Sequence, residues 1–280
     1  MRESGKYALA AMLVSLVQVI RSRTINWTDD MTIYFQRMLN FQVVTISAAN
    51  MMDLVLGMVP ILIFEVLGGV YLYQHFCTAN VYYFSRQADR NLWFGKECLK
   101  LYGYMVWYYF IMAVGSVLWG ELVLGENMPN PWSVQGVKTA CICIGLWGMF
   151  TYIFTLLINL LSIKFGSQNA TVVVIGVQYF LIMLLGILGA RVVGVEEWSV
   201  MEAGQGYWII RLNPIANMVV QWHSGIEGFQ GLITNDDELV RYPLSYSWIY
   251  YGIGILLVMA VGLIIVKHHD IGMENKEEQG

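Results

Sequence analysis

The chain has 280 residues, of which 57% are hydrophobic and only 13% are charged. A soluble globular domain has about 25% charged residues, so this composition is typical of a membrane protein instead. The length allows about six membrane-spanning helices with short loops, and it is too short for six spans and a nucleotide-binding domain together. The net charge is −4 and the sequence shows no basic patch, which excludes nucleic acid as a partner.

Two consecutive stretches contain no charged side chain, the first from Ala140 to Ile163 and the second from Phe165 to Ala190. About 20 apolar residues are enough to cross the hydrocarbon of a bilayer as a helix. Every backbone N–H and C=O in hydrocarbon must be paired within the protein, so these stretches are predicted to be helices. Their continuous rather than alternating hydrophobicity excludes an outer-membrane barrel.

The same criterion predicts an all-α, polytopic membrane protein with one transmembrane domain over residues 1–280. The first apolar run, Tyr7 to Ile20, fits either a signal-peptide core or a short span in length. Because no small-residue cleavage site precedes Arg21, we favour an uncleaved span. The six predicted spans cover residues 7–22, 43–75, 101–122, 137–163, 170–193 and 245–266.

The distribution of Lys and Arg predicts the orientation of these spans. The loops on the side of the N-terminus have a small excess of these residues, which is concentrated between Arg86 and Lys100. We therefore expect an inner (plasma) membrane protein whose N- and C-termini both lie in the cytoplasm. The opposite side collects acidic residues, which count little in this rule.

A charged connector, residues 81–97, lies between the second and third predicted spans. If it is helical, Phe84, Ala88 and Leu92 share one face and most of its charges lie on the others. Such an amphipathic helix can lie in the membrane interface or insert its apolar face into a groove on a cytoplasmic partner. The alternative is a solvated loop with interfacial anchors.

Two carboxylic acids, Asp53 and Glu65, fall well inside the second predicted span. A charge in the bilayer is costly, so both are candidate intramembrane polar sites, although either could instead be hydrated near an interface. Their spacing corresponds to about 18 Å of straight helix, so they cannot act as one carboxylate pair within a chain. Glu65 could pair with a cation, line a polar path or hold a proton.

The longest segment outside the spans, residues 194–244, is rich in Tyr and Trp, which prefer the membrane–water boundary. Its part 207–226 is apolar enough to enter the bilayer and return, and a seventh span is the competing interpretation. The sequence predicts no metal site, because His268 and His269 lie at a helix end and the four cysteines lack ligand spacing. It also has no zinc-protease, serine-hydrolase or Walker motif, so we do not expect an enzyme.

The six spans, the connector and the Asn-Pro-containing segment 211–217 together resemble a type-two ABC transporter permease. In that family two identical or homologous permease subunits pair, and separate ATPases dock on the connector, called the coupling helix. ATP and Mg²⁺ would therefore bind to the partner subunits, and this chain would need no cofactor. The resemblance implies that the ATPase contacts Arg86, Asp89, Arg90, Trp93 and Lys96, and that Asn213 and Pro214 belong to a re-entrant outer gate.

On this basis the expected function is export of an amphipathic or lipid-like substrate, such as a peptide, an antibiotic or a lipid. The alternative is a membrane sensor, scaffold or immunity protein that binds a ligand at residues 194–244. A third possibility, an intramembrane enzyme that uses Glu65 or Asp53, needs a second catalytic group, which the sequence does not show. The lipid bilayer is a partner in each case.

Overall fold

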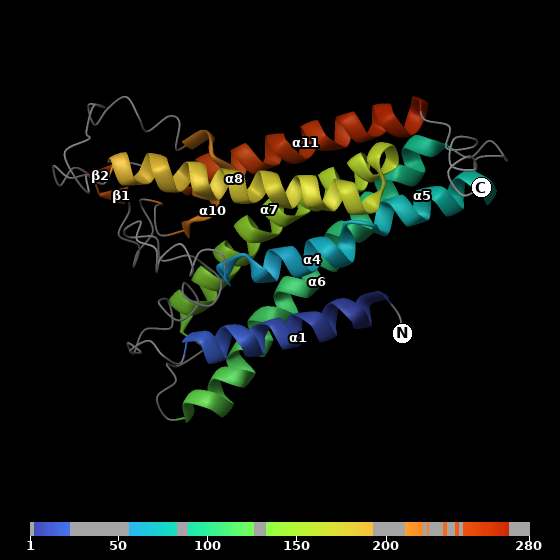
Figure 1. The fold of residues 1–280 in the computed structure, drawn as a ribbon. Coiled ribbons are helices and arrows are strands. Elements are labelled where there is room, and N and C mark those ends of the chain that lie inside the picture. Colours follow the sequence, from blue (N-terminus) through green and yellow to red (C-terminus); the bar gives the residue numbers. More distant parts are fainter. Residues whose placement is uncertain are drawn as a thin grey trace.

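The computed structural model describes residues 3–22, 56–82, 89–125, 133–192, 211–220, 223, 232–233, 239–240 and 243–268. This part of the chain is almost entirely helical (Figure 1). Its helices are α1 (Glu3–Ser22), α4 (Val59–Gly68), α5 (Tyr71–Tyr82), α6 (Arg90–Leu124), α7 (Val134–Phe165), α8 (Ser167–Val192), α10 (Pro214–Met218) and α11 (Leu244–His268). Two short strands, β1 (Leu232–Ile233) and β2 (Leu239–Val240), form an antiparallel pair.

Six segments of this structure are long and apolar enough to cross a membrane, which makes the protein a multi-pass membrane protein. They are formed by α1, by α4 and α5 together, and by α6, α7, α8 and α11. Each of the six predicted spans therefore corresponds to an observed one. The predicted span 43–75 is confirmed only in its second half, because residues 43–55 lie outside the described part of the chain.

The helices begin and end where local chemistry satisfies their backbone. Asp89 caps the start of α6 by accepting hydrogen bonds from two backbone amides, and Ser133 caps α7 by accepting one from the Gly136 amide at 3.0 Å. Gly125 and Gly166 follow the ends of α6 and α7 with φ values of 57° and 77°. A side chain disfavours such positive φ values, so glycine suits the reversal between α7 and α8.

The helix α7 forms the centre of the bundle, where it contacts α4, α5, α6, α8, α10 and α11. Two of its largest side chains, Trp147 and Phe150, are fully buried. The helix α1 lies against α6, where the ring of Tyr7 stacks on that of Tyr104 with centroids 5.1 Å apart. By contrast, α8 and α11 expose many large apolar side chains, as expected for helices that face lipid.

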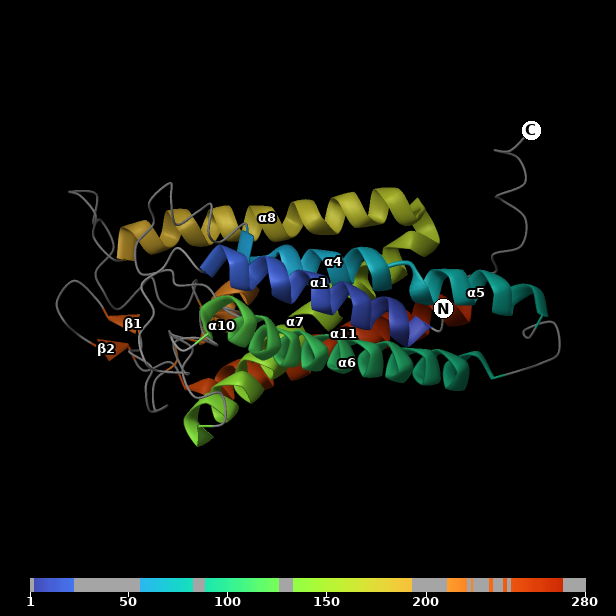
Figure 2. The ribbon, with the colours of Figure 1, turned by 90° about the horizontal axis from the view of Figure 1, so that it is seen from below.

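The two ends of the bundle differ in what they carry. The first residue of α1, the last residues of α5 and α11, and the turn between α7 and α8 lie at one end (Figure 1). The helix α10 and the strand pair lie at the other end, and the view from below shows the same separation (Figure 2). The end of α5 and the start of α6, called the connector end below, therefore lie at the opposite end of the bundle from α10.

The third span differs from its predicted bounds. The sequence predicts a span over 101–122 preceded by a separate connector helix, whereas α6 runs without a break from Arg90 to Leu124. A helix of this length extends about 52 Å, well beyond the roughly 30 Å of hydrocarbon. Residues 90–97 are thus the first turns of α6 and not a helix of their own, and residues 83–88, with Arg86, lie outside the described residues.

Candidate functional site: polar clusters inside the helical bundle

The second span is interrupted between α4 and α5 at Gly69 and Val70. The amide of Gly69 still donates to the carbonyl oxygen of Glu65 at 2.7 Å, and α5 begins two residues later. A Cβ atom on Gly69 would lie 2.8 Å from Cγ2 of Ile158 on α7, which is closer than packing allows. Glycine therefore permits the close approach of the two helices at the interruption.

A single side chain of α7, Asn159, bridges this interruption. Its Nδ2 donates to the carbonyl oxygens of Gly68 at 2.9 Å and of Thr155 at 2.8 Å. Its Oδ1 accepts from the amides of Leu72 at 2.7 Å and of Tyr73 at 3.2 Å, the first amides of α5. Backbone groups freed inside a membrane must find partners within the protein, and Asn159 supplies them on both sides of the break.

One turn before the interruption, Glu65 points into the bundle with no exposed surface. Its Oε1 accepts a hydrogen bond from Nε2 of Gln178 on α8 at 2.6 Å, and Gln178 is equally buried. No donor among the described residues reaches Oε2 of Glu65, and no cation pairs with it there. The predicted intramembrane acid at this position is thus a buried group held between two spans.

The described polar groups around Glu65 are uncharged side chains. Tyr109 of α6 lies close enough to Glu65 for the two groups to interact electrostatically. The hydroxyl oxygen of Tyr109 is 2.6 Å from Oγ1 of Thr151 on α7. The neighbouring Tyr108 donates to the carbonyl oxygen of Pro60 at 2.9 Å. The other predicted acid, Asp53, lies outside the described residues.

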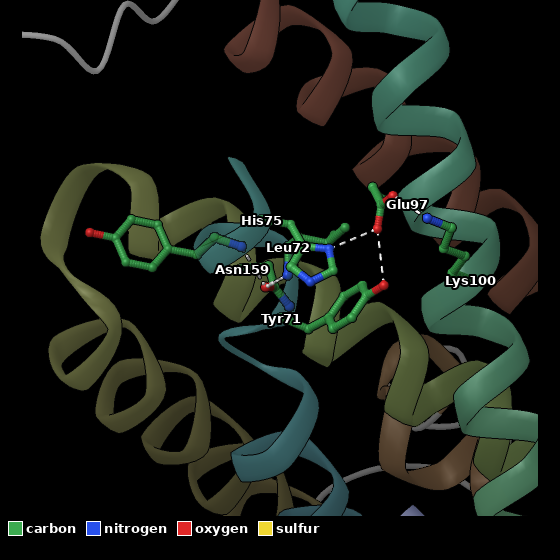
Figure 3. A network of polar contacts seen from close by, with 7 residues as sticks. Tyr71, Leu72, His75, Glu97, Lys100 and Asn159 are labelled. Atoms are coloured by element: carbon green, nitrogen blue, oxygen red, sulfur yellow. Dashed lines mark hydrogen bonds and ion pairs between the residues drawn. The ribbon is translucent and has the colours of Figure 1, made fainter. Parts of the chain in front are cut away.

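A second polar cluster joins α5 to the first turns of α6 near the connector end (Figure 3). Oε2 of Glu97 accepts from the hydroxyl of Tyr71 at 2.9 Å and is 3.0 Å from Nδ1 of His75. Oε1 of the same carboxylate pairs with Nζ of Lys100 at 2.5 Å. Because Glu97 is buried and has polar partners on both helices, this cluster fastens α5 to α6.

The predicted ATPase-contacting residues lie at the start of α6, apart from Arg86. Asp89 is exposed and serves as the N-cap, accepting from the amides of Asn91 at 2.9 Å and Leu92 at 3.3 Å. Trp93 is half-buried, with its ring centroid 5.8 Å from that of Phe76 on α5. Arg90 is half-buried and Lys96 is exposed. These positions are compatible with a docking surface, which stays a prediction.

At the opposite end, the predicted gate residues form a buried anchor for α10. Asn213 caps α10 by accepting from the Ile215 amide at 2.8 Å, and its Nδ2 donates to the carbonyl oxygen of Leu181 on α8 at 2.9 Å. The carbonyl oxygen of Pro214 accepts from the hydroxyl of Tyr251 on α11 at 2.6 Å. The Asn-Pro pair therefore ties α10 to two spans, while the re-entrant path of residues 207–226 stays a prediction.

Further buried polar side chains form hydrogen bonds next to α10. The hydroxyl oxygen of Ser247 on α11 is 2.8 Å from Oδ1 of Asn217 and 2.8 Å from Nε2 of His223. Nδ1 of His223 faces the carbonyl oxygen of Val219 at 3.0 Å. Burial lowers the pKa of His223 from 6.5 to about 4, although the nearby carbonyl groups partly oppose this effect. His223 is therefore neutral at physiological pH.

The chemistry of these clusters is hydrogen bonding. The described residues contain no group of three or more His, Cys, Asp or Glu side chains placed to hold a metal ion. The cysteines among them are all free thiols. The clusters instead connect helix to helix: α4 to α8 through Glu65, α5 to α7 through Asn159, and α5 to α6 through Glu97.

Sequence reasoning identified Glu65, Asn213 and Pro214 but missed Asn159, Gln178 and Glu97. The signal for Asn159 was an amide inside a stretch without charges, and its proximity to Gly68 and Gly69 is shown only by the tertiary structure. Gln178 occupies the same kind of position in the following span. Glu97 resembled any other charge of the connector, and only the start of α6 at Arg90 shows that it lies inside a long helix.

Comparison of the chain with protein-family models, with curated proteins and with solved structures gives no match in any of the three.

Proposed function

We propose that this protein is the membrane-spanning permease subunit of an ABC-type exporter, driven by ATP hydrolysis on a separate subunit. The observation that carries the proposal is the mechanical path from the connector end into the membrane. The helix α6 starts at Arg90, within the connector 81–97, and Glu97 fastens its first turns to α5. The helix α5 in turn meets α4 at the interruption beside Gly69.

This arrangement suits the transmission of movement from a partner. A displacement at the start of α6 would carry α5 with it, because the Glu97 cluster joins the two helices. The interruption at Gly69 would let α5 change its angle to α4 while Asn159 keeps the freed backbone groups paired. Rigid helices that move about a short hinge are a common basis of switching between two states.

The proposed orientation places the connector end in the cytoplasm, where ATP is available, and α10 at the outer side. Two copies of the chain, or this chain and a homologous permease, would form the transport path between them. The substrate class is amphipathic or lipid-like, such as a peptide, an antibiotic or a lipid. The support for this class is the low charged fraction of the chain, 13%, and the apolar side chains exposed on α8 and α11.

The first experiment is purification of the tagged full chain from its native membrane in a mild detergent, with mass spectrometry of the proteins that accompany it. A stoichiometric subunit with a Walker ATP-binding loop is the expected result. A chain that is recovered alone, or only with copies of itself, contradicts the permease proposal and favours a ligand-binding sensor, scaffold or immunity protein.

A matched pair of variants then tests the docking surface. Lys96→Glu reverses an exposed charge in the first turns of α6, and Lys138→Glu does the same near the start of α7, at the other end of the bundle. We expect Lys96→Glu to weaken association with the ATPase about tenfold, which corresponds to about 1.4 kcal/mol. Lys138→Glu should leave it unchanged. Equal effects of the two substitutions would contradict docking at the connector end.

A further inference from the structure

The contact between Glu65 and Gln178 leaves two buried oxygen atoms without a hydrogen-bond donor among the described residues. Gln178 Nε2 donates to Glu65 Oε1 at 2.6 Å, so the two side chains already face each other. Glu65 Oε2 and Gln178 Oε1 are both buried, and no donor among the described residues reaches either atom. One further hydrogen, placed on one of these atoms, is what the pair requires.

No charge on the described residues takes the place of that hydrogen. The helices packed against α4 are α1, α5, α6, α7 and α8. Among the described residues, the ionisable side chains that they bring to the region of Glu65 are Tyr7 on α1 and Tyr108 on α6, which both contact the ring of Phe64, and Tyr109 on α6. The polar groups from α7 and α8 are hydroxyls and the amide of Gln178. Phenols ordinarily ionise near pH 10, so none of these groups carries a charge at neutral pH.

An ionised Glu65 would therefore be a buried carboxylate with one hydrogen bond and no counter-ion. Such a charge is among the most costly groups to place inside a membrane. A neutral carboxylic acid avoids this cost and gains a donor, because it can present one O–H and one C=O to a carboxamide that presents one C=O and one N–H. A proton on Glu65 Oε2 provides the donor that Gln178 Oε1 lacks.

We propose that Glu65 and Gln178 form a proton-binding site within the membrane, which is occupied by a proton in this conformation and joins α4 to α8. Binding forms an O–H bond at Oε2 with a proton taken from water, and the carboxyl group changes from anionic to neutral. Release returns the proton to water and leaves a carboxylate that must be hydrated. Separation of α4 and α8 would let water reach it, so proton release favours an open contact between them.

The position of this site gives the proton a structural consequence. The carbonyl oxygen of Glu65 accepts from the amide of Gly69, so the acid lies one turn before the interruption of the second span. A change in the contact between α4 and α8 therefore acts on the segment about which α5 can move. The proton site is independent of whether an ATPase binds at the connector end, and its test requires only the isolated protein.

Infrared spectroscopy of the full chain in lipid nanodiscs tests the protonation directly. A protonated carboxylic acid has a carbonyl stretch that a carboxylate lacks, and this band shifts in heavy water. We expect the band at neutral pH in the wild-type protein and its loss in Glu65→Gln, which keeps the shape of the side chain. Glu121→Gln, at an exposed glutamate of α6, is the matched control and should keep the band. A wild-type spectrum with no Glu65-dependent acid band at neutral pH overturns the proposal.

A variant in which the acid and the amide are exchanged distinguishes a proton-binding site from a purely structural contact. The double variant Glu65→Gln with Gln178→Glu places the acid on α8 and the amide on α4, and we expect the acid band to return. Failure of the band to return in a folded double variant contradicts a paired acid–amide site.

Thermal unfolding over pH provides a second readout. If the folded state holds a proton that the unfolded chain releases, stability falls as pH rises through the neutral range. This fall should be present in the wild type and absent in Glu65→Gln. Stabilisation of the wild type, but not of Glu65→Gln, by sodium or potassium ions at constant pH would instead assign the site to a metal cation and overturn the proton assignment.

Discussion

Replacement of Asn159 by leucine should destabilise the bundle more than any other single change to an uncharged polar group of α7. The substitution keeps the number and branching of the side-chain heavy atoms while removing the hydrogen bonds to Gly68, Thr155, Leu72 and Tyr73. Three of the lost partners are backbone groups at the interruption, which lies inside a span and has no regular helical bonds to replace them. The carbonyl oxygen of Thr155 belongs to the interior of α7 and keeps its helical bond.

The expected magnitude follows from these three groups. A buried polar group left without its partner costs about 1–3 kcal/mol, whereas hydrogen bonds between membrane helices are worth about 0.6 kcal/mol on average. We therefore expect Asn159→Leu to lower the free energy of unfolding by about 2–4 kcal/mol. The measurement is equilibrium unfolding in mixed detergent micelles, followed by circular dichroism, at constant lipid and pH.

The control is the same substitution at Asn169, an exposed residue whose side chain makes one hydrogen bond, to the carbonyl oxygen of Phe165 at 3.1 Å. Asn169→Leu should change the free energy of unfolding by less than about 1 kcal/mol. Hydrogen exchange at the amides of Leu72 and Tyr73 should become faster only in Asn159→Leu. If the two variants unfold alike and exchange is unchanged, packing rather than Asn159 maintains the interruption.

Two further predictions concern the close approach at the interruption and the buried histidine. Gly69→Ala should lower the free energy of unfolding by about 1–3 kcal/mol, because its Cβ would collide with Ile158. The control is Gly103→Ala, where a Cβ meets no atom within 4 Å, and it should be neutral or stabilising in the same unfolding assay. The folded protein binds a proton at His223 only near pH 4, but the unfolded chain does so near pH 6.5, so the unfolded state takes up the proton first as the pH falls. The free energy of unfolding should thus decrease by up to about 3 kcal/mol as the pH falls from about 6.5 to about 4. Thermal unfolding across that pH range should show a smaller decrease in His223→Gln than in the wild type. Identical pH profiles would show that His223 is not the group responsible.

The polar clusters have a common arrangement along the second span. Glu65 lies before the interruption, Asn159 lies beside it, and Glu97 contacts the helix that follows it. Each cluster joins this span to a different helix, namely α8, α7 or α6. The first half of the second span therefore contacts α8, the second half contacts α6, and Asn159 of α7 bonds both halves at the interruption.

The spans were predictable from the sequence because insertion into a membrane depends on local composition. A stretch such as 140–163, without a charge, can satisfy its backbone only as a helix, whatever surrounds it. The start of the third span was not predictable in this way. Charged residues between Arg90 and Lys100 resemble a loop or a separate interfacial helix, but α6 continues through them because Asp89 caps it and Glu97 finds partners on α5.

The candidate sites likewise combine features that the sequence predicts with features that only the tertiary structure shows. An acid inside an apolar run marked Glu65 as a functional candidate, because the cost of burying a charge follows from the sequence alone. Its partner Gln178 lies 113 residues further along the chain, and no local pattern connects the two. The predictions for Arg86 and Asp53 concern residues outside the described part of the chain and stay predictions.

By itself the sequence determined that this protein spans a membrane about six times through helices, and where most of those helices lie. Only the tertiary structure decided that the second span is interrupted at Gly69, that Asn159 bridges the interruption, and that Glu65 meets an amide rather than a cation. The physical reason is the range of the forces involved. Hydrophobic burial and backbone pairing act on each segment separately, whereas the partner of a buried polar group depends on which helices pack together.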